Sequence, residues 1–175
     1  MTAYVALLRG VNVGGHRKVP MAELRAVAAA LGFENASTYV QSGNLVFRAD
    51  GEAGEVRARL EAAIAAHFGF EVDVALRSRE EWARIAGAHP LDGPERDPRF
   101  LHVVACRDTP DPARVEALTP ERVAPEEVEV RGREVYVFYP NGAGRSKLVI
   151  DLGTPGTARN WRTVLALRDL LEALE

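Results

Sequence analysis

Two loops of this sequence combine glycines with hydrogen-bonding side chains, which suits the binding of an anion. The first is RGVNVGGHRK at residues 9–18, directly after the apolar stretch Tyr4–Leu8, and the second is NGAGRSK at residues 141–147. Glycines let backbone N–H groups point into a concavity, and a nearby lysine or arginine adds positive charge. The first loop fits a phosphate or carboxylate site as well as it fits a set of tight turns. Tight turns alone explain the second loop slightly better.

Neither loop carries a known nucleotide-binding pattern. In the first loop Gly10 lies four residues before Gly14, and Gly14 adjoins Gly15, so the dinucleotide fingerprint G-x-G-x-x-G is absent. The second loop does not match the P-loop pattern G-x-x-x-x-G-K-[ST]. The loops therefore predict an anion site of generic chemistry, and no cofactor is indicated.

Catalytic patterns are weak in this chain. The histidines are scattered without a metal-ligand spacing such as H-E-x-x-H, so we expect no metal site. A G-x-S-x-G nucleophile elbow is also absent. Ser146 beside Lys147, and His16 in the first loop, are the available hints of an activated group, but adjacency in sequence does not provide hydrogen-bond geometry. Whether the chain is an enzyme therefore stays open.

A third segment, TARNWR at residues 157–162, adds positive charge near the predicted start of the last helix. Arg159 and Arg162 are three residues apart, so they would share a helix face. The helix dipole disfavours cations at this end, and a bound anion would relieve that repulsion. Carboxylates from the other half of the chain are the alternative partners for these arginines.

The secondary structure predicted around these loops has the order β-α-β-β-α-β. In the first half we expect a strand at 4–8, a helix over 20–31, two strands around a tight turn at Ser42–Gly43, a helix over 52–68, a strand at 70–78, and a helix over 79–88 capped by Ser78. This order is typical of a ferredoxin-like fold.

The second half repeats the pattern after a proline-rich boundary at residues 89–100. Its predicted elements are a strand at 100–106, a short helix at 111–118, a hairpin turning at Arg131–Gly132, and a last helix from about Ala158 to Leu174 capped by Thr157. The sequence therefore predicts an α+β fold with two ferredoxin-like β-α-β-β-α-β halves, antiparallel sheets and a C-terminal helix. The expected domains are residues 1–92 and residues 93–175.

The predicted topology brings polar residues to one edge of the first sheet. In a ferredoxin-like sheet of strand order 4-1-3-2, the loop after strand one and the turn between strands two and three lie at the same end. A second group of polar residues lies in the C-terminal segments, and whether the two groups form one site is open. The predicted ligand-binding residues are Arg9, Asn12, Lys18, Gln41, Ser42, Asn44, Ser146, Lys147, Arg159, Asn160 and Arg162.

The amino-acid composition restricts the cellular compartment in which we expect the protein and the classes of partner that it could bind. The single cysteine, Cys106, follows an apolar run, which indicates a buried thiol in a reducing cytosol. The N-terminal apolar stretch is too short for a signal peptide, and no run approaches the roughly 20 residues that span a membrane, so we expect a cytoplasmic protein. The net charge of −3 argues against nucleic acid as a partner. The partner we expect is a small anionic ligand, because the polar loops combine glycines with cationic side chains. Nucleic-acid binding on a local basic patch is the alternative function, and the oligomeric state is not predicted.

The motifs taken together resemble the bacterial "domain of unknown function 1697" family. Its members typically read LLRGINVGG, then K-x-x-M-x-x-L, then Y-x-QSGN-x-x-F; here LLRGVNVGG departs only at Val11, and RSK and TARNWRT are similar to the family's ending. The resemblance implies a bacterial cytosolic protein with a ferredoxin-like α/β fold and no established activity. One departure is that LVIDLGTPG is shorter than the helical segment usual after SK. The family pattern includes Arg9, Asn12, Gly14, Gly15, Lys18, Gln41, Ser42, Gly43, Asn44, Ser146, Lys147, Arg159, Asn160 and Trp161.

Overall fold

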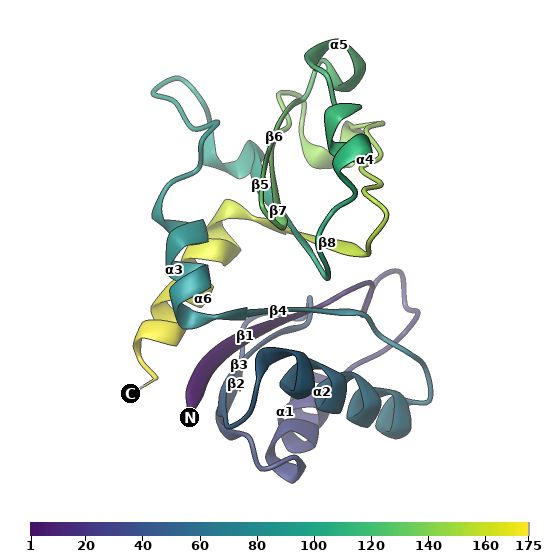
Figure 1. Cartoon of the computed structure of the whole chain (residues 1–175), viewed down its shortest axis with the longest axis vertical. Coiled ribbons are helices and arrows are strands. Elements are labelled where there is room, and N and C mark those ends of the chain that lie inside the picture. Colours follow the sequence, from purple (N-terminus) through teal and green to yellow (C-terminus); the bar gives the residue numbers. More distant parts are fainter. Residues whose placement is uncertain (175) are drawn as a thin grey trace. The chain divides into compact units, whose positions relative to one another are not determined.

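The computed structural model describes residues 1–174, and the chain packs into two compact units. The first unit is Met1–Arg84 together with the segment from Ala166 onwards, and the second unit is Ile85–Leu165. Each unit contains a four-stranded antiparallel sheet (Figure 1). The division into two domains at residue 92 stays a prediction.

The first unit has the predicted ferredoxin-like topology. Its sheet has the strand order β2-β3-β1-β4, and α1 and α2 cover one face of it (Figure 1). Side chains from both helices, such as Leu24 and Leu60, form the core with Phe47 of the sheet. The elements are β1 (Thr2–Leu8), α1 (Met21–Ala30), β2 (Glu34–Thr38), β3 (Asn44–Ala49), α2 (Ala53–Phe68), β4 (Val74–Ser78) and α3 (Arg79–Gly87).

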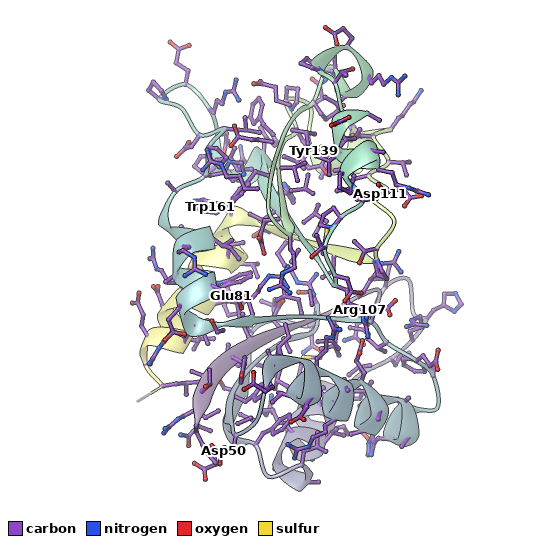
Figure 2. All side chains as sticks on the ribbon, viewed as in Figure 1. Asp50, Glu81, Arg107, Asp111, Tyr139 and Trp161 are labelled. Carbon is purple, nitrogen blue, oxygen red and sulfur yellow. The ribbon has the colours of Figure 1, made fainter. Side chains whose placement is uncertain are left out.

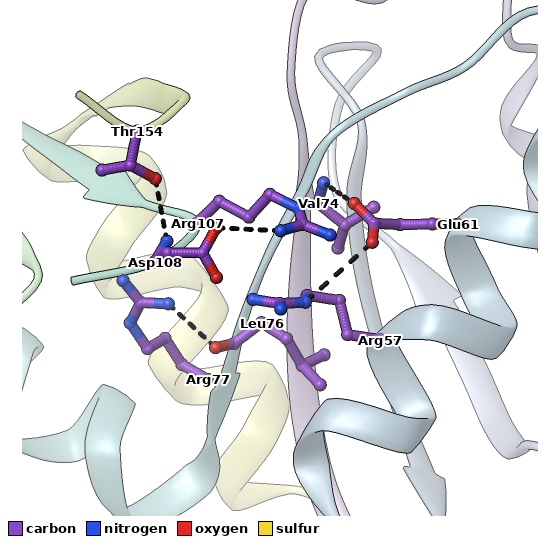
Figure 3. Close-up of polar contacts among 8 residues, drawn as sticks. All are labelled: Arg57, Glu61, Val74, Leu76, Arg77, Arg107, Asp108 and Thr154. Carbon is purple, nitrogen blue, oxygen red and sulfur yellow. Dashed lines mark hydrogen bonds and ion pairs between the residues drawn. The ribbon is translucent and has the colours of Figure 1, made fainter. Parts of the chain in front are cut away.

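The edge strand of this sheet is tied to α2 by one carboxylate. Glu61 accepts a hydrogen bond from the backbone N–H of Val74 at 3.0 Å, and it forms an ion pair with Arg57 at 3.9 Å (Figure 3). An N–H group on an outer strand has no strand partner on its open side, so a side-chain acceptor satisfies it. The contact stabilises the start of β4.

The second unit repeats the same strand order, β6-β7-β5-β8. Between β7 and β8, where the first unit has α2, the chain makes the short 3-10 helix η2 and then runs without regular structure to β8. Leu148, Ile150 and Leu152 of this coil pack with Cys106 and Val135 of the sheet, so the coil forms the cover that a helix forms in the first unit. The elements are η1 (Pro98–Phe100), β5 (Leu101–Cys106), α4 (Pro112–Glu116), α5 (Pro120–Val123), β6 (Glu127–Arg131), β7 (Glu134–Phe138), η2 (Ala143–Arg145) and β8 (Gly156–Asn160).

Side-chain caps and turns stabilise the short elements of the second unit. Asp111, just before α4, accepts a hydrogen bond from the backbone N–H of Ala113 at 3.0 Å (Figure 2). Thr154 accepts one from the backbone N–H of Asp108, also at 3.0 Å (Figure 3). Such bonds satisfy N–H groups that a short helix or a loop leaves without partners.

The prediction that the last helix begins near Ala158 with Thr157 as its cap is wrong. Residues Gly156–Asn160 form β8, which pairs antiparallel with β5, and the helix α6 is Trp161–Glu172. Its cap is Asn160, whose Oδ1 accepts a hydrogen bond from the backbone N–H of Thr163 at 2.9 Å. Hydrogen bonding to β5 along this segment outweighs the local helix preference of alanine and arginine.

The last strands of the two halves end in the same way. Arg77 of β4 and Arg159 of β8 are both buried, and each donates from Nη1 to the carbonyl of its preceding residue at 2.9 Å (Figure 3 shows Arg77). The next residue, Ser78 or Asn160, accepts a hydrogen bond from the backbone of the following helix. The shared arrangement supports the interpretation of two related halves.

The fold class predicted from the sequence is therefore confirmed. The structure is α+β, with two antiparallel sheets of ferredoxin-like strand order and a C-terminal helix. A smaller difference concerns β2, which lies at Glu34–Thr38, so that the connection to β3 is a longer loop than the expected tight turn. Within residues 1–174 the structure has no helix with both the length and the apolar character needed to cross a membrane.

Candidate functional site

The loop after β1 and the turn before β3 lie at the same end of the first sheet, as the predicted topology requires. Leu7, at the end of β1, pairs with Asn44, at the start of β3. The backbone N–H of Leu8 then donates to the carbonyl of Gly43 at 2.9 Å. We call the exposed parts of residues 9–18 and 40–42 the loop rim of the first unit.

Asn12 holds this loop and this turn together. Its side-chain amide donates to the carbonyls of Val19 at 2.9 Å and Gln41 at 2.6 Å, and its Oδ1 accepts from the backbone N–H of Val19 at 2.8 Å. All three bonds go to backbone groups, so the side chain is committed to the architecture of the rim. Asn12 therefore positions the neighbouring groups.

Asn44, another predicted ligand residue, is fully buried. Its amide donates to the carbonyl of Tyr39 at 2.9 Å and to the hydroxyl of Ser42 at 2.8 Å. Gly43 beside it has φ +84°, and a Cβ there would lie 2.8 Å from side-chain atoms of both Leu8 and Val11. These residues of the QSGN segment hold the turn closed.

The remaining predicted residues of the rim are exposed. They are Arg9, Lys18, Gln41 and Ser42. Neither of the two segments that form the rim, residues 9–18 and 40–42, contains an acidic residue. Arg17 is held in place, because it donates to the carbonyls of Gly10 and Glu71 and its guanidinium lies 4.9 Å from the ring centroid of Phe70. The rim thus presents cationic and neutral polar side chains on a backbone that Asn12 and Gly43 hold in place.

In the second unit the loop at 141–147 lines a cavity of about 330 Å³, which we call the cationic cavity. Its exposed charged residues are Arg122, Arg145 and Lys147, and the amide of Asn141 lies among them. The buried Glu126 is its one acid. The lining residues are Arg122, Val123, Ala124, Pro125, Glu126, Asn141, Arg145, Lys147 and Leu148.

The three cations of this cavity have no ion-pair partner. Among the residues that the structure describes, no carboxylate lies within ion-pair distance of Arg122, Arg145 or Lys147, and none of the three donates a side-chain hydrogen bond. Glu126 is on the same cavity but pairs with none of them. The cavity therefore keeps an uncompensated positive charge.

Most other arginines of the second unit are compensated. Arg96 pairs with Glu127 at 2.6 Å, Arg107 with Asp108 at 2.8 Å (Figure 3), and Arg114 with Asp151 at 2.8 Å. Against this background, the cluster of unpaired cations around one hollow stands out.

Ser146 has a backbone role in the same loop. Its hydroxyl oxygen accepts a hydrogen bond from the backbone N–H of Leu148 at 3.1 Å, and its own N–H donates to the carbonyl of Ala143 at 3.2 Å. These bonds shape the exit from η2. The side chain of the neighbouring Lys147 makes no hydrogen bond to Ser146 within residues 1–174, so the geometry gives no support to an activated hydroxyl.

The predicted arginine pair of the TARNWR segment is not a pair. Arg159 lies on β8, with only 8% of its surface exposed, and donates to the hydroxyl of Thr157 at 2.6 Å; Arg162 lies on α6. The two do not share a helix face, because the helix begins only at Trp161. Burial lowers the pKa of Arg159 to about 10.

Asn160 and Arg162 line a different cavity of the second unit, of about 610 Å³, which we call the Trp161 cavity. Figure 2 shows Trp161 at the start of α6. Pro98 and Leu165 supply further apolar surface. The lining residues are Asp97, Pro98, Arg99, Asn160, Trp161, Arg162 and Leu165.

Three residues of the cationic cavity escaped the sequence-based prediction of the site. Arg145 and Asn141 lie in the glycine-rich loop at residues 141–147, but a sequence does not distinguish an arginine that has an ion-pair partner from one that has none. Arg122 lies on the short helix α5, outside the glycine-rich loops of the sequence.

The described part of the chain has no cluster of three His, Cys, Asp or Glu side chains that could hold a metal ion.

Comparisons with known proteins agree with the fold. The family model described as "Protein of unknown function (DUF1697)" matches residues 1–136. Among solved structures, the conserved bacterial protein SP0830 from Streptococcus pneumoniae is similar, with 28% identity, a TM-score of 0.73, and coverage of 97% of this chain and 98% of that chain. No curated protein matches. Since the family model covers well over half of the sequence, the chain belongs to the DUF1697 family of proteins of unknown function.

Proposed function

We propose that this protein binds a small anionic ligand, carrying a phosphate or carboxylate group, in the cationic cavity of the second unit. The observation that carries the proposal is the grouping of Arg122, Arg145 and Lys147 around one hollow without an ion-pair partner in the described chain. Like charges held near one another repel, and a bound anion replaces that repulsion by charge-assisted hydrogen bonds.

The residue types also suit an oxyanion. A guanidinium presents a planar fork of donors that matches phosphate and carboxylate, and an ammonium acts as a compact point charge. Asn141 adds an amide that can donate or accept. The volume of about 330 Å³ is at the small end of the roughly 300–1,000 Å³ typical of ligand pockets. The ligand is therefore a small metabolite.

Glu126 restricts the ligand further. Its carboxylate lines the same cavity and is buried, so a second negative group of a ligand would be repelled there. A hydroxyl would instead donate a hydrogen bond to it. We therefore propose a ligand with one anionic group for the cations and a neutral hydroxyl group for Glu126, such as a hydroxy acid or a phosphorylated polyol.

The loop rim of the first unit is the alternative place for the same kind of ligand. Lys18, Arg9 and the amide of Gln41 are exposed there, and the loop and turn contain no acid that would oppose an anion. Binding at the rim and binding in the cationic cavity would be weakened by different substitutions, so one series of titrations distinguishes the two sites.

The test is isothermal titration with inorganic phosphate, glycerol 3-phosphate and lactate. Arg145→Met and Lys147→Met should each weaken binding about tenfold or more, because a hydrogen bond to a charged group contributes about 1.5–3 kcal/mol. Arg168→Met is the matched control, since Arg168 pairs with Asp169 on the surface of α6. Lys18→Met should leave binding unchanged.

Two results would overturn the proposal. One is the absence of binding of all three probes at millimolar concentration by the parent protein. The other is equal binding by the parent protein and by Arg145→Met and Lys147→Met. If Lys18→Met alone weakens binding, the ligand belongs to the loop rim.

A further inference from the structure

We propose that the second unit has a separate binding site, the Trp161 cavity, for a small amphipathic acid: a molecule with a compact apolar body and one carboxylate or sulfonate. This inference goes beyond the proposed function. It concerns a different cavity, whose lining shares no residue with the cationic cavity, and it requires an apolar part that a phosphorylated polyol does not have.

The cavity has the size and lining of a small-molecule site. Its volume of about 610 Å³ lies within the roughly 300–1,000 Å³ of typical ligand pockets, which are mostly apolar with a few polar groups. Trp161 and Leu165 are four residues apart on α6, so their side chains lie on one face of the helix. Together with Pro98 they form an apolar wall.

The aromatic part of this wall is held in place before any ligand binds. The ring of His89 meets the ring of Trp161 edge-on, with centroids 5.2 Å apart and an interplanar angle of 86°. His89 is itself fixed, because its Nε2 lies 3.0 Å from the carbonyl of His102 and its Nδ1 accepts from the backbone N–H of Leu91 at 3.2 Å. A wall that is already ordered loses little entropy on binding.

The polar edge of the cavity carries one uncompensated positive charge. Asp97 and Arg99 neutralise each other through two hydrogen bonds, at 2.9 and 2.7 Å, from the guanidinium to one carboxylate oxygen. Arg162 has no ion-pair partner within the described residues. One anionic group on the ligand therefore matches the charge of this edge.

Asn160 adds a hydrogen-bond donor next to this charge. Its Oδ1 is occupied by the N–H of Thr163 at the start of α6, which leaves its amide N–H groups available as donors. A carboxylate or sulfonate accepts from both Arg162 and this amide. An uncharged apolar molecule would leave the guanidinium without a partner, and a polar anion would gain nothing from Trp161 and Leu165.

The test uses 8-anilinonaphthalene-1-sulfonate, a fluorescent aromatic sulfonate, with the full-length protein. We expect saturable binding to a single class of site, displaced by octanoate but by neither octanol nor inorganic phosphate. Arg162→Met should weaken binding about tenfold, since a charge-assisted hydrogen bond contributes about 1.5–3 kcal/mol. Leu165→Ser should weaken it through the apolar wall.

Control variants separate this site from the cationic cavity and from unfolding. Arg168→Met, on the same helix, and Arg145→Met, in the cationic cavity, should bind the probe as the parent does, and near-ultraviolet circular dichroism should show that every variant is folded. Non-saturable binding would overturn the inference. So would displacement by octanol as effective as by octanoate, or unchanged binding by folded Arg162→Met.

Discussion

The side-chain amide of Asn12 donates a 2.6 Å hydrogen bond to the backbone carbonyl of Gln41, a residue 29 positions further along the chain. The same side chain makes two hydrogen bonds to Val19. One residue thus closes its own loop and fastens it to the turn before β3. The backbone of the loop rim depends on this link, whatever the rim binds.

Asn12→Ala should therefore destabilise the first unit more than the replacement of asparagine by alanine at a left-handed backbone position would by itself. Asn35→Ala is a matched control, because both asparagines have left-handed backbones, with φ of 56° and 55°, and Asn35 is exposed without a side-chain hydrogen bond in the described chain. We expect Asn12→Ala to lower the free energy of unfolding by about 3 kcal/mol more than Asn35→Ala, at about 1 kcal/mol for each of the three hydrogen bonds. Urea unfolding measures both, and equal losses would show that the three bonds contribute nothing net.

Gly43→Ala should be poorly tolerated. A Cβ at Gly43 would lie 2.8 Å from atoms of Leu8 and Val11, and φ there is +84°. Gly10 is the control, because its φ is +68° but a Cβ would meet nothing within 4 Å. We expect a cost of about 1 kcal/mol for Gly10→Ala from the backbone alone, and a further 1–3 kcal/mol or so for Gly43→Ala from steric overlap. Thermal unfolding at matched pH gives the comparison.

Val40→Asn should stabilise the protein. Val40 has φ of 51°, which is strained for a β-branched residue, while its side chain is 53% exposed and gains little from burial. Asparagine adopts this conformation more readily, so we expect a gain of about 0.5–1 kcal/mol. The exposed Val13 is the control, because it is not among the residues with positive φ, and Val13→Asn should change stability by less than about 0.5 kcal/mol. A loss of stability in Val40→Asn would contradict the assignment of strain.

The buried His89 should make the second unit sensitive to acid. Burial is the main cause that lowers the pKa of His89 below its ordinary value of 6.5; Arg131 also lowers it, while the hydrogen bond to His102, Asp92 and Glu129 raise it. The folded state favours the neutral imidazole of His89, because its Nδ1 accepts a hydrogen bond from the backbone N–H of Leu91. A proton on that nitrogen would remove the bond.

The direction of the pH effect follows from linkage. The unfolded chain binds the His89 proton at a higher pH than the folded chain, so the free energy of unfolding should fall as pH falls below about 6.5. The half-buried His102, whose pKa is also lowered by burial, should contribute in the same direction. Urea unfolding between about pH 7.5 and pH 5 should show a shallower pH dependence in His89→Gln than in the parent. An equal pH dependence in His89→Gln and in the parent protein would contradict this assignment.

Local patterns in the sequence predicted the elements that depend on near neighbours. Apolar runs and their spacing predicted β1, α2 and β5, and Gly132, with φ of +60°, marks the hairpin turn that the sequence indicated. The order of these elements was enough to place Asn12 and Gln41 at one end of the sheet. Strand direction alone decides which loops meet, so no knowledge of side-chain contacts was needed.

The elements that depend on distant partners were harder to predict. Thr157 and Arg159 stand opposite Ala105 and Val103 of β5, and this pairing turns a segment with helical preferences into a strand. Leu148 and Leu152 pack on the sheet without forming a helix, and no periodic pattern of apolar residues in this segment predicts that packing. Both outcomes depend on surfaces supplied by residues far away in the chain.

The sequence by itself determined the order of strands and helices in the first half, the family resemblance, and the convergence of the first loop with the QSGN turn. Only the tertiary structure decided the roles of the polar residues: Asn12 and Asn44 bond to backbone, and Arg159 is buried. It also decided which cations are unpaired, and hence that Arg145 and Lys147 share a cavity with Arg122. The physical reason is that backbone preferences act over a few residues, whereas ion pairs and cavities arise from contacts between segments that only folding brings together.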